Sequence, residues 1–497
     1  MRDVWLGLDL GTSSVKCLAL DADGEVVASA QERYPIDRPH AGWAEQEPER
    51  WWRAVVSVVA AVSAALGGSA GVRSIGLAGQ MHGLVLVDAA GRPVRPAIIW
   101  SDARAATQVG IWRESPGDEL VEHMTGFRSA SGMAALSLAW LRANAPDVLD
   151  SAAWALQPKD YVRLRLTGEA ALDPTDAGAS LLFDLHAGAP AAPLLAAAGV
   201  DATLLPPLHP TLAAAGTLTT ASAGELGLPA GIPVATGGGD QAMAALALGI
   251  AEPGRAAITL SSGGTVLVPV PHGFPAPSGY HRLAAAEAGA QLGMGVVLAA
   301  GIATDWLAGV VGAQASELLL AAADARMDPS LLAHADLGGT RTPVVDSRTQ
   351  GAFAGLGLQH GREHLMRAIV ESVAISLTDG LAALDSASGL RTTELVLSGG
   401  GARFAVWRQA VADAAGMTVV RSSDLEHPAL GAALAAAHAD GAAVSFEPRT
   451  RVDGVVHPDG ESVDRLGEIR LRRPPLTTAS LPGGTRDAGA QQREENA

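Results

Sequence analysis

The sequence is poor in cysteine and in aromatic residues. Its single cysteine, Cys17, excludes an intrachain disulfide framework and any metal site built from several cysteines. Aromatic residues make up only 4% of the chain while 48% of residues are hydrophobic, so alanine, valine and leucine must fill the core. A length of 497 residues exceeds one ordinary core, and two or three domains are expected.

Positive charge and long apolar runs are also scarce. The chain has 35 Lys and Arg against 52 Asp and Glu, and the net charge of −17 argues against nucleic acid or an anionic membrane as a partner. The longest weakly polar run, residues 288–304, is interrupted by four glycines and a glutamine and falls short of a membrane span. No signal-peptide pattern opens the chain, so we expect a cytoplasmic protein.

A glycine-rich segment near the middle of the chain precedes a carboxylate. Residues 235–241 read Ala-Thr-Gly-Gly-Gly-Asp-Gln, and glycine tolerates both tight turns and close approach to a ligand. An apolar segment at 231–234 and a helical pattern at 241–249 place Asp240 at the carboxyl end of a strand, where open α/β sheets bind ligands. The alternative interpretation is a turn with a solvent-exposed Asp, and this segment alone does not distinguish it from a ligand-binding site.

Two segments, 5–20 and 257–268, share one layout of apolar strand, turn rich in glycine and hydroxyl groups, and second apolar strand. A duplicated domain whose halves each present a phosphate-facing turn is one interpretation; coincidence between two common hairpins is the other. The candidate phosphate-binding residues are Gly11, Thr12, Ser13, Ser14 and Lys16 in the first hairpin and Ser262, Gly263, Gly264 and Thr265 in the second.

A third glycine loop lies at residues 398–402, between a predicted strand at 394–397 and a predicted helix at 404–415. This order suits a nucleotide, because the loop can approach it closely and a helix N-terminus favours negative charge. The loop matches neither the dinucleotide-binding fingerprint nor the P-loop. The candidate nucleotide-binding residues are Gly399, Gly400, Gly401 and Ala402.

Two further segments offer side chains for a small substrate. Residues 79–83, Gly-Gln-Met-His-Gly, follow a predicted strand at 74–78 and would lie at the ligand-binding edge. An Asp and an Arg two positions apart follow a strand at 96–100, and they form either a surface ion pair or partners for a sugar's hydroxyl groups. The candidate side chains are Gln80, Met81, His82, Asp102 and Arg104.

Together these parts suit phosphoryl transfer, which needs donors around the phosphates, a carboxylate for Mg²⁺ and a base for the acceptor hydroxyl. Asp9, at the end of the first strand, fits the Mg²⁺ role through water molecules, since Mg²⁺ keeps much of its hydration. Asp240 fits the base, next to the metal and, with Gln241, beside the acceptor.

These motifs resemble the FGGY carbohydrate kinases of the actin/Hsp70/sugar kinase superfamily. The matching residues are 7–16, 239–241 and 399–402, the pattern Trp100-x-Asp102-x-Arg104, and shorter stretches at 166–168, 175–176, 341–343 and 367–371, in family order from residue 4 to about 440. The resemblance implies two actin-like (ribonuclease H-like) α/β domains with a cleft between them. Residues 1–245 would bind the sugar and supply the base, residues 246–473 would bind ATP, and residues 474–497 would form a disordered tail.

Within that family, the segment 79–83 is similar to the xylulokinases. The resemblance implies that Met81 and His82 contact a ketopentose and that Mg²⁺-ATP phosphorylates D-xylulose at its terminal hydroxyl. Ser137 and Thr340 depart from the family pattern, which carries Lys and Glu there, so ribulose, L-xylulose, gluconate and glycerol stay open as substrates.

Two readings from other functional classes also stay open: a sugar or nucleotide sensor, and an actin-like or chaperone ATPase. Retention of both Asp9 and Asp240 argues against the sensor, and the loop at 80–82 has no role in such an ATPase. Alanine-rich helices allow a homodimer, which no sequence rule fixes.

Overall fold

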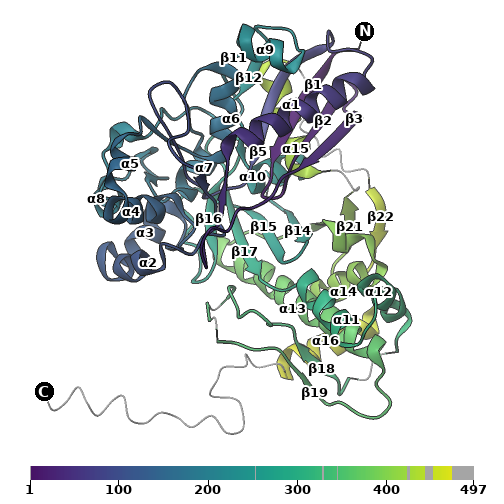
Figure 1. Cartoon of the computed structure of the whole chain (residues 1–497). Helices are drawn as coiled ribbons and strands as arrows, with labels where there is room; N and C mark the ends of the chain where they lie inside the picture. Colours follow the sequence, from purple (N-terminus) through teal and green to yellow (C-terminus); the bar gives the residue numbers. More distant parts are fainter. Residues whose placement is uncertain are drawn as a thin grey trace, which may run out of the picture.

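The computed structural model describes residues 2–251, 253–326, 329–343, 345–346, 348–422, 426–442 and 452–472. In this part of the chain, two sheets of seven strands each form the cores of two lobes, one above the other in Figure 1. The expected two-domain α/β fold is confirmed. The predicted tail at 474–497 lies outside the described residues.

The first sheet has the strand order β11-β12-β5-β1-β2-β3, with the short β13 also pairing with β5. The predicted hairpin at residues 5–20 is present as β1 and β2, and β3 extends it as a third antiparallel strand. Strands β5 and β12 run parallel to β1, so their carboxyl ends share one edge. The bounds are β1 (Val4–Leu10), β2 (Ser14–Asp21), β3 (Val26–Arg33), β5 (Val72–Gly79), β11 (Ala214–Thr217), β12 (Pro233–Ala235) and β13 (Gly238–Gly239).

Helix α15 (His427–Ala439) covers the first sheet, although it follows the strands of the second sheet in sequence. It packs on β1 and β5, where a Cβ on Gly7 would lie 1.9 Å from the Ala429 oxygen and one on Gly76 1.8 Å from the Ala432 oxygen. Glycine in a strand allows such close backbone approach. Helix α15 therefore packs on the sheet of the first lobe, although in sequence it falls within the proposed second domain, residues 246–473.

Between β5 and β11 the chain is mostly helical and packs around a second apolar cluster. Residues 158–161 begin α6, where Pro158 occupies the first turn and the Asp160 carboxylate accepts from the Gln157 backbone N–H at 3.3 Å. The helices of the first lobe are α1 (Pro48–Ala65), α2 (Ala106–Trp112), η1 (Arg113–Gly117), α3 (Asp118–Thr125), α4 (Ala134–Asn144), α5 (Pro146–Asp150), α6 (Pro158–Thr167), α7 (Pro174–Ala179), α8 (Ala192–Ala198), η2 (Ala202–Leu204), α9 (Thr220–Leu226) and α10 (Asp240–Leu248), and its short strands are β4 (Glu45–Gln46), β6 (Val85–Val87), β7 (Ala97–Ile98), β8 (Trp154–Leu156), β9 (Phe183–Asp184) and β10 (Ala189–Pro190).

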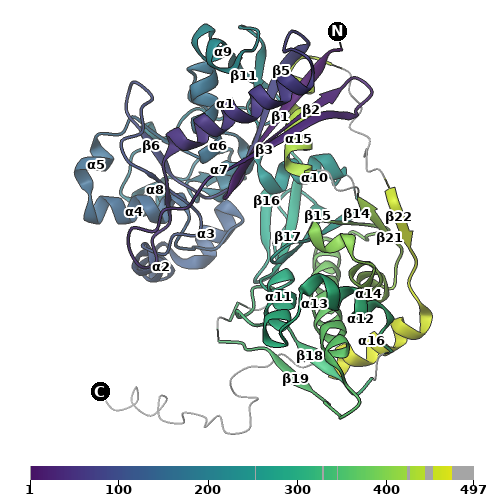
Figure 2. The same cartoon turned by 45° about the vertical axis from the view of Figure 1, so that its right-hand side comes forward.

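The second sheet has the order β16-β17-β15-β14-β20-β21-β22, and β14 pairs with β20 in parallel. Figures 1 and 2 both show α13 and α14 beneath this sheet and β16 and β17 reaching up to the first lobe. The bounds are β14 (Arg255–Leu260), β15 (Gly264–Val270), β16 (His281–Ala284), β17 (Gln291–Val297), α11 (Gly301–Val310), α12 (Ala315–Asp324), β18 (Leu332–His334), β19 (Ala352–Ala354), α13 (Arg362–Ser388), β20 (Glu394–Ser398), η3 (Gly400–Arg403), α14 (Ala405–Ala415), β21 (Val419–Ser422), β22 (Val452–Val456) and α16 (Gly460–Arg472).

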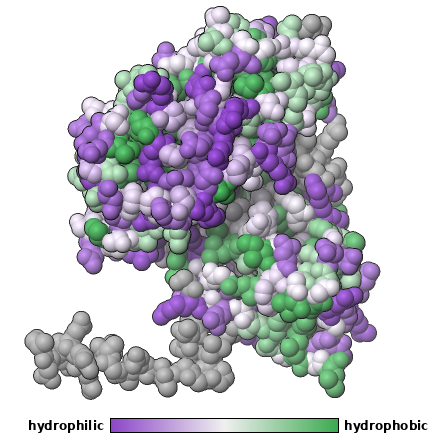
Figure 3. All heavy atoms as spheres, in the orientation of Figure 1, coloured by the Kyte–Doolittle hydropathy of each residue, from purple (hydrophilic) through white to green (hydrophobic). Residues whose placement is uncertain are grey.

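The surface of the lower lobe exposes apolar side chains, seen as green in the lower part of Figure 3. On α11 the exposed ones are Ile302, Trp306 and Val310, spaced four residues apart on one face of the helix. Among the described residues no single helix is long and apolar enough to cross a membrane; α11 and α12, bent by 98° at their junction, meet the length and composition test only as a pair.

Candidate active site

Asp9 and Asp240 come from the same edge of the first sheet. Asp9 lies near the end of β1, which runs parallel to β5, and β13 pairs with β5 just before Asp240 begins α10. Burial and, to a smaller extent, the charge of Asp240 together raise the pKa of Asp9 to about 7, while Lys16 opposes the shift. Burial also raises the pKa of Asp240 to about 6, against hydrogen bonds from Gln241. The structure thus brings together the two carboxylates that the sequence singled out.

This pair of carboxylates fits a divalent cation. Oδ1 of Asp9 is buried and accepts no hydrogen bond among the described residues, so it is available as a metal ligand. Over the same residues, no group of three or more His, Cys, Asp or Glu side chains could hold a metal ion. Mg²⁺ suits such a site, because it binds one or two carboxylates and completes its shell with water and substrate phosphates.

The glycine segment before Asp240 is fixed by hydrogen bonds to its backbone. Arg163 donates to the Thr236 carbonyl at 2.7 Å, the Gly237 N–H donates to the Thr211 carbonyl at 3.0 Å, and the Gly239 N–H donates to Thr175 Oγ1 at 2.8 Å. Gly237 has φ of 75°, and a Cβ there would lie 2.2 Å from the Leu77 oxygen, so this position requires glycine. The segment is a fixed support for Asp240 rather than a loose turn.

Behind this segment lies a buried charge cluster that the sequence reasoning missed. Lys159 Nζ contacts carboxylate oxygens of Asp160 at 2.6 Å, Asp173 at 2.5 Å and Asp176 at 3.0 Å. Burial lowers the pKa of Lys159, but the three carboxylates outweigh burial and hold it above its usual value. Burial raises the pKa of Asp176 well above its ordinary value. The sequence does not reveal this cluster, because Lys159 pairs with Asp173 and Asp176 from a separate segment of the chain.

The charge cluster reaches the glycine segment through Thr175. Asp173 is the N-cap of α7 and accepts from the Thr175 backbone N–H at 2.8 Å and from the Thr175 hydroxyl at 2.5 Å. The same hydroxyl oxygen accepts the Gly239 N–H. The order Lys159, Asp173, Thr175, Gly239 therefore connects a buried cation to the residue directly before Asp240.

Residues 80–82 lie beside this support. Gln80 donates to Gln46 Oε1 at 3.1 Å, while its own Oε1 is buried without a hydrogen-bond partner in the described structure. Met81 is buried, and a Cβ on Gly239 would lie 3.0 Å from its sulfur. Met81 therefore lies beside the residue that precedes Asp240, as expected for a substrate loop, whereas the contacts of Gln80 are with Gln46.

His82 has an unusual backbone, with φ of 73°, and its Nδ1–H donates to the Ala179 carbonyl at 2.8 Å. Burial lowers the pKa of His82, so the ring is neutral at pH 7 and its Nε2 can accept a hydrogen bond from a hydroxyl group. The ring packs edge-on against Phe127, which stacks on His281 of β16 at 5.2 Å between ring centres. The second lobe therefore forms part of the wall around His82.

Asp102 and Arg104 are both buried, so the surface-pair interpretation is wrong. Arg104 donates to Asp102 from Nε at 2.9 Å and to Glu45 from Nη2 at 2.7 Å, and its guanidinium carbon lies 3.7 Å from the centre of the Trp43 ring. Asp102 also accepts from the Ala44 N–H at 2.6 Å. Among the described residues, Nη1 is the only guanidinium nitrogen of Arg104 without a hydrogen-bond partner. A sugar could therefore accept a hydrogen bond from Arg104 only at Nη1.

The first hairpin presents fewer unused groups than the sequence suggested. Its turn is closed by the Gly11 N–H donating to the Ser14 carbonyl at 3.0 Å. Thr12 Oγ1 accepts from Trp100 at 2.9 Å and Ser14 Oγ accepts from Gln31 at 2.8 Å, while the Ser13 side chain is exposed. Lys16 forms an ion pair with Glu426 at 2.5 Å, so a nucleotide would have to compete for this cation.

The second hairpin and the third glycine loop meet at one edge of the second sheet. Thr259 of β14 faces Ser398 of β20 in the parallel pairing, and their hydroxyl oxygens are 2.8 Å apart. A cavity of about 300 Å³ opens there, beside the N-terminal part of α11. Its lining includes Ser261, Ser262, Thr304, Asp305, Gly400, Gly401, Phe404 and Trp407.

Not every predicted nucleotide-binding residue lines this cavity. Gly263 and Gly399 lie beside lining residues, whereas Gly264 is buried with Leu377 3.0 Å from where its Cβ would be. Thr265 lies within β15 and Ala402 is buried. These three residues support the loops and do not reach the cavity.

Comparison with known proteins gives a consistent result along the chain. The model of the FGGY family of carbohydrate kinases, N-terminal domain, matches residues 4–247, and that of the C-terminal domain matches residues 265–439. A xylulose kinase of Escherichia coli (strain K12) is 34% identical over 501 residues, covering 99% of this chain and 97% of its own, and one of Klebsiella pneumoniae is 35% identical over 437 residues, covering 86% and 89%. A crystal structure of a xyloylose kinase from Brucella ovis superposes with a TM-score of 0.88 at 33% identity, covering 94% of this chain and 97% of that one.

Proposed function

The chain belongs to the FGGY family of carbohydrate kinases, and we propose that it transfers the γ-phosphoryl group of ATP to the terminal hydroxyl of D-xylulose, giving D-xylulose 5-phosphate and ADP. Relatives named xylulose kinase over nearly the whole chain support this choice of sugar. The observation that carries the mechanism is the pair of buried carboxylates, Asp9 and Asp240, at one edge of the first sheet.

In this mechanism Asp240 takes the proton of the 5-hydroxyl as its oxygen attacks the γ-phosphorus. A pKa near 6 leaves the carboxylate mostly ionised at pH 7 and makes it a stronger base than an ordinary aspartate. His82 and Met81 contact the ketose, and the cavity beside Ser262 and Gly400 holds the adenosine. Asp9 would hold Mg²⁺, which would supply positive charge against the charge that develops on the phosphates.

The test is an ADP-release assay across ketoses, polyols and aldonates. We expect D-xylulose to have the highest kcat/KM, and a strong preference for ribulose, L-xylulose, gluconate or glycerol would overturn the proposed sugar. No ADP release with any acceptor would overturn the kinase mechanism.

Replacement of the base separates chemistry from folding. Asp240→Asn keeps the size of the side chain and should lower kcat by about 10²–10⁴-fold, the usual contribution of a general base, with little change in Tm. Asp9→Asn is the companion variant, and it should raise the Mg²⁺ concentration needed for half-maximal rate. A near-normal kcat in the Asp240 variant would sink its assignment as the base.

Several expectations stay predictions. We propose sugar binding by residues 1–245 and ATP binding by residues 246–473, with α15 as the exception described above. The cytoplasmic location and the homodimer also stay predictions.

A further inference from the structure

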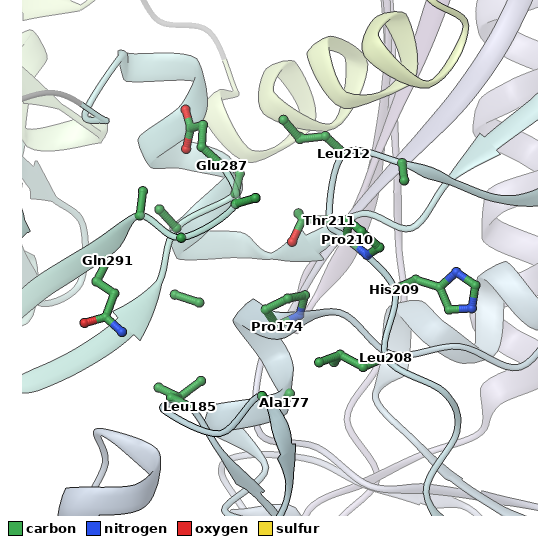
Figure 4. Close-up of a pocket in the computed structure, with 18 of the residues that line it drawn as sticks. Pro174, Ala177, Leu185, Leu208, His209, Pro210, Thr211, Leu212, Glu287 and Gln291 are labelled. Atoms are coloured by element: carbon green, nitrogen blue, oxygen red, sulfur yellow. The ribbon is translucent and has the colours of Figure 1, made fainter. Parts of the chain in front are cut away.

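A second, larger cavity of about 680 Å³ lies between the two lobes (Figure 4). None of the catalytic, substrate-binding or nucleotide-binding residues proposed above lines it. Its walls come from α7 and residues 208–213 of the first lobe, from residues 284–291 of the second lobe, and from His438 near the end of α15. This volume is in the range of pockets that enclose a small organic molecule.

The chemistry of the cavity favours a neutral, mostly apolar ligand. Ala284, Ala285, Leu208 and Leu212 are among its lining residues, and the carboxyl groups of Asp184 and Glu287, which also line it, disfavour an anion. Apolar surface with a few polar groups is the usual composition of such pockets.

One polar group inside the cavity has no partner. Thr211 is only 2% exposed, and its hydroxyl makes no hydrogen bond among the described residues. A Cβ on Gly238 would lie 3.1 Å from the Thr211 methyl, so the methyl faces the glycine segment, and Figure 4 shows the hydroxyl turned toward the space between α7 and the strands of the second lobe. Buried hydroxyl groups are normally hydrogen-bonded, so a ligand group that pairs with this one is stabilised there.

The inner walls of the cavity also hold the glycine segment before Asp240. Thr211 lines the cavity, and its carbonyl accepts the Gly237 N–H at 3.0 Å. Pro174 lines the cavity as well, and the next residue, Thr175, accepts the Gly239 N–H at 2.8 Å. A molecule in the cavity therefore touches both elements that position the proposed base.

We propose that this cavity is a regulatory site for a neutral, mostly apolar small molecule with one hydrogen-bonding group, and that its occupation lowers kcat. The occupant contacts both lobes at once, so it fixes their separation, and the kinase cycle requires the lobes to close and reopen. The effect on kcat rests on the proposed function; the binding itself does not.

Binding is tested on the full chain with N-phenyl-1-naphthylamine, a neutral fluorescent probe with a single N–H donor. We expect a saturable rise in fluorescence with one site per chain. Ala284→Trp fills the cavity from β16 and should abolish the signal, whereas Ala221→Trp, on the exposed face of α9 outside the cavity, should bind the probe as the wild type does. Thr211→Val keeps the shape but removes the hydroxyl, and should weaken binding by about fivefold, the usual value of one hydrogen bond.

Turnover is then measured at saturating probe with the best acceptor found in the ADP-release panel. We expect kcat to fall at least twofold for the wild type and the Ala221→Trp variant, and to show no response for Ala284→Trp. An unchanged wild-type kcat would overturn the regulatory role. Absent saturable binding, or equal binding by Ala284→Trp, would overturn the site. If Ala284→Trp does not fold by circular dichroism, Thr211→Val decides, and equal affinity in that variant counts against the site.

Failure of the proposed function gives a different result. A protein that binds the probe and loses it on Ala284→Trp, but phosphorylates no sugar, would retain the site and lose the kinase assignment.

Discussion

Removal of one buried hydroxyl, in Thr175→Val, tests whether the glycine segment positions Asp240. Valine has nearly the shape of threonine, so the packing of α7 is kept. The variant loses the 2.8 Å acceptor for the Gly239 N–H and the 2.5 Å donor to Asp173. An unpaired buried N–H costs about 1–3 kcal/mol, and the lost hydrogen bond to a carboxylate about 1.5–3 kcal/mol. The segment is therefore expected to shift until the Gly239 N–H finds another partner.

Such a shift moves Asp240, the next residue, away from the acceptor hydroxyl. Misplacement of a reacting group by about 1 Å can cost about 10²-fold in rate, so we expect kcat to fall by about that factor. KM for ATP should change little, because the cavity proposed to hold the nucleotide lies on the second lobe. Thermal unfolding should show a lower Tm, by about 2–4 °C for each kcal/mol lost.

Steady-state kinetics of Thr175→Val beside Thr175→Ser is the deciding assay. Serine restores the hydroxyl and loses only a methyl group, so its kcat should stay within about threefold of the wild type, a difference of less than one kcal/mol. A purely structural role for Thr175 would lower Tm in both variants without separating their kcat values. Wild-type kcat in the valine variant would refute the positioning role.

Three further predictions follow from burial and close packing. With Asp240 as the proposed base, only its ionised form is active, so kcat/KM should fall about tenfold for each pH unit below its pKa of about 6, which a pH profile measures. Burial lowers the pKa of His281 from 6.5 to about 3, so its contribution to stability is present above pH 6.5 and is lost as the pH falls toward 3. Phenylalanine does not titrate, so the unfolding free energy of His281→Phe, measured in denaturant, should rise by about 2 kcal/mol relative to that of the wild type when the pH is lowered from 7 to 5. Gly76→Ala should lower the unfolding free energy by about 3 kcal/mol because its Cβ meets α15 backbone at 1.8 Å, whereas Gly224→Ala, with open space around it, should raise that energy by about 0.5–1 kcal/mol.

Local sequence patterns predict the structure correctly where it depends on residues that are neighbours in the chain. The two hairpins and the strand ends at Asp9 and Asp240 follow from apolar runs bounded by turn residues, and the structure contains them. The same reasoning failed for contacts between distant residues. The side chains that contact Arg104, among them Trp43 and Trp140, come from separate segments, and no periodic pattern in the sequence predicts these contacts.

Helix α15 shows why the lobe assignment could not be read from the order of the chain. Its sequence is mostly alanine, leucine and glycine. Such a helix can pack on any apolar surface, so its composition does not predict which sheet it covers. The information was instead in the strands that it covers, where only glycine at positions 7 and 76 leaves room for helix backbone. In these two strands a glycine marks the close approach of a helix and not a turn or a ligand.

The same helix limits how the two lobes can move. Because α15 is locked onto β1 and β5, it must travel with the first lobe, together with Glu426 directly before it, which pairs with Lys16 of β2. β21, the preceding strand, is hydrogen-bonded into the second sheet and must travel with the second lobe. Along the chain, the boundary between the two lobes therefore passes between β21 and α15 and again between α10 and β14. His438, near the end of α15, also lines the large cavity, so a molecule bound there contacts the helix that travels with the first lobe as well as residues 284–291 of the second, and it resists any change in their separation.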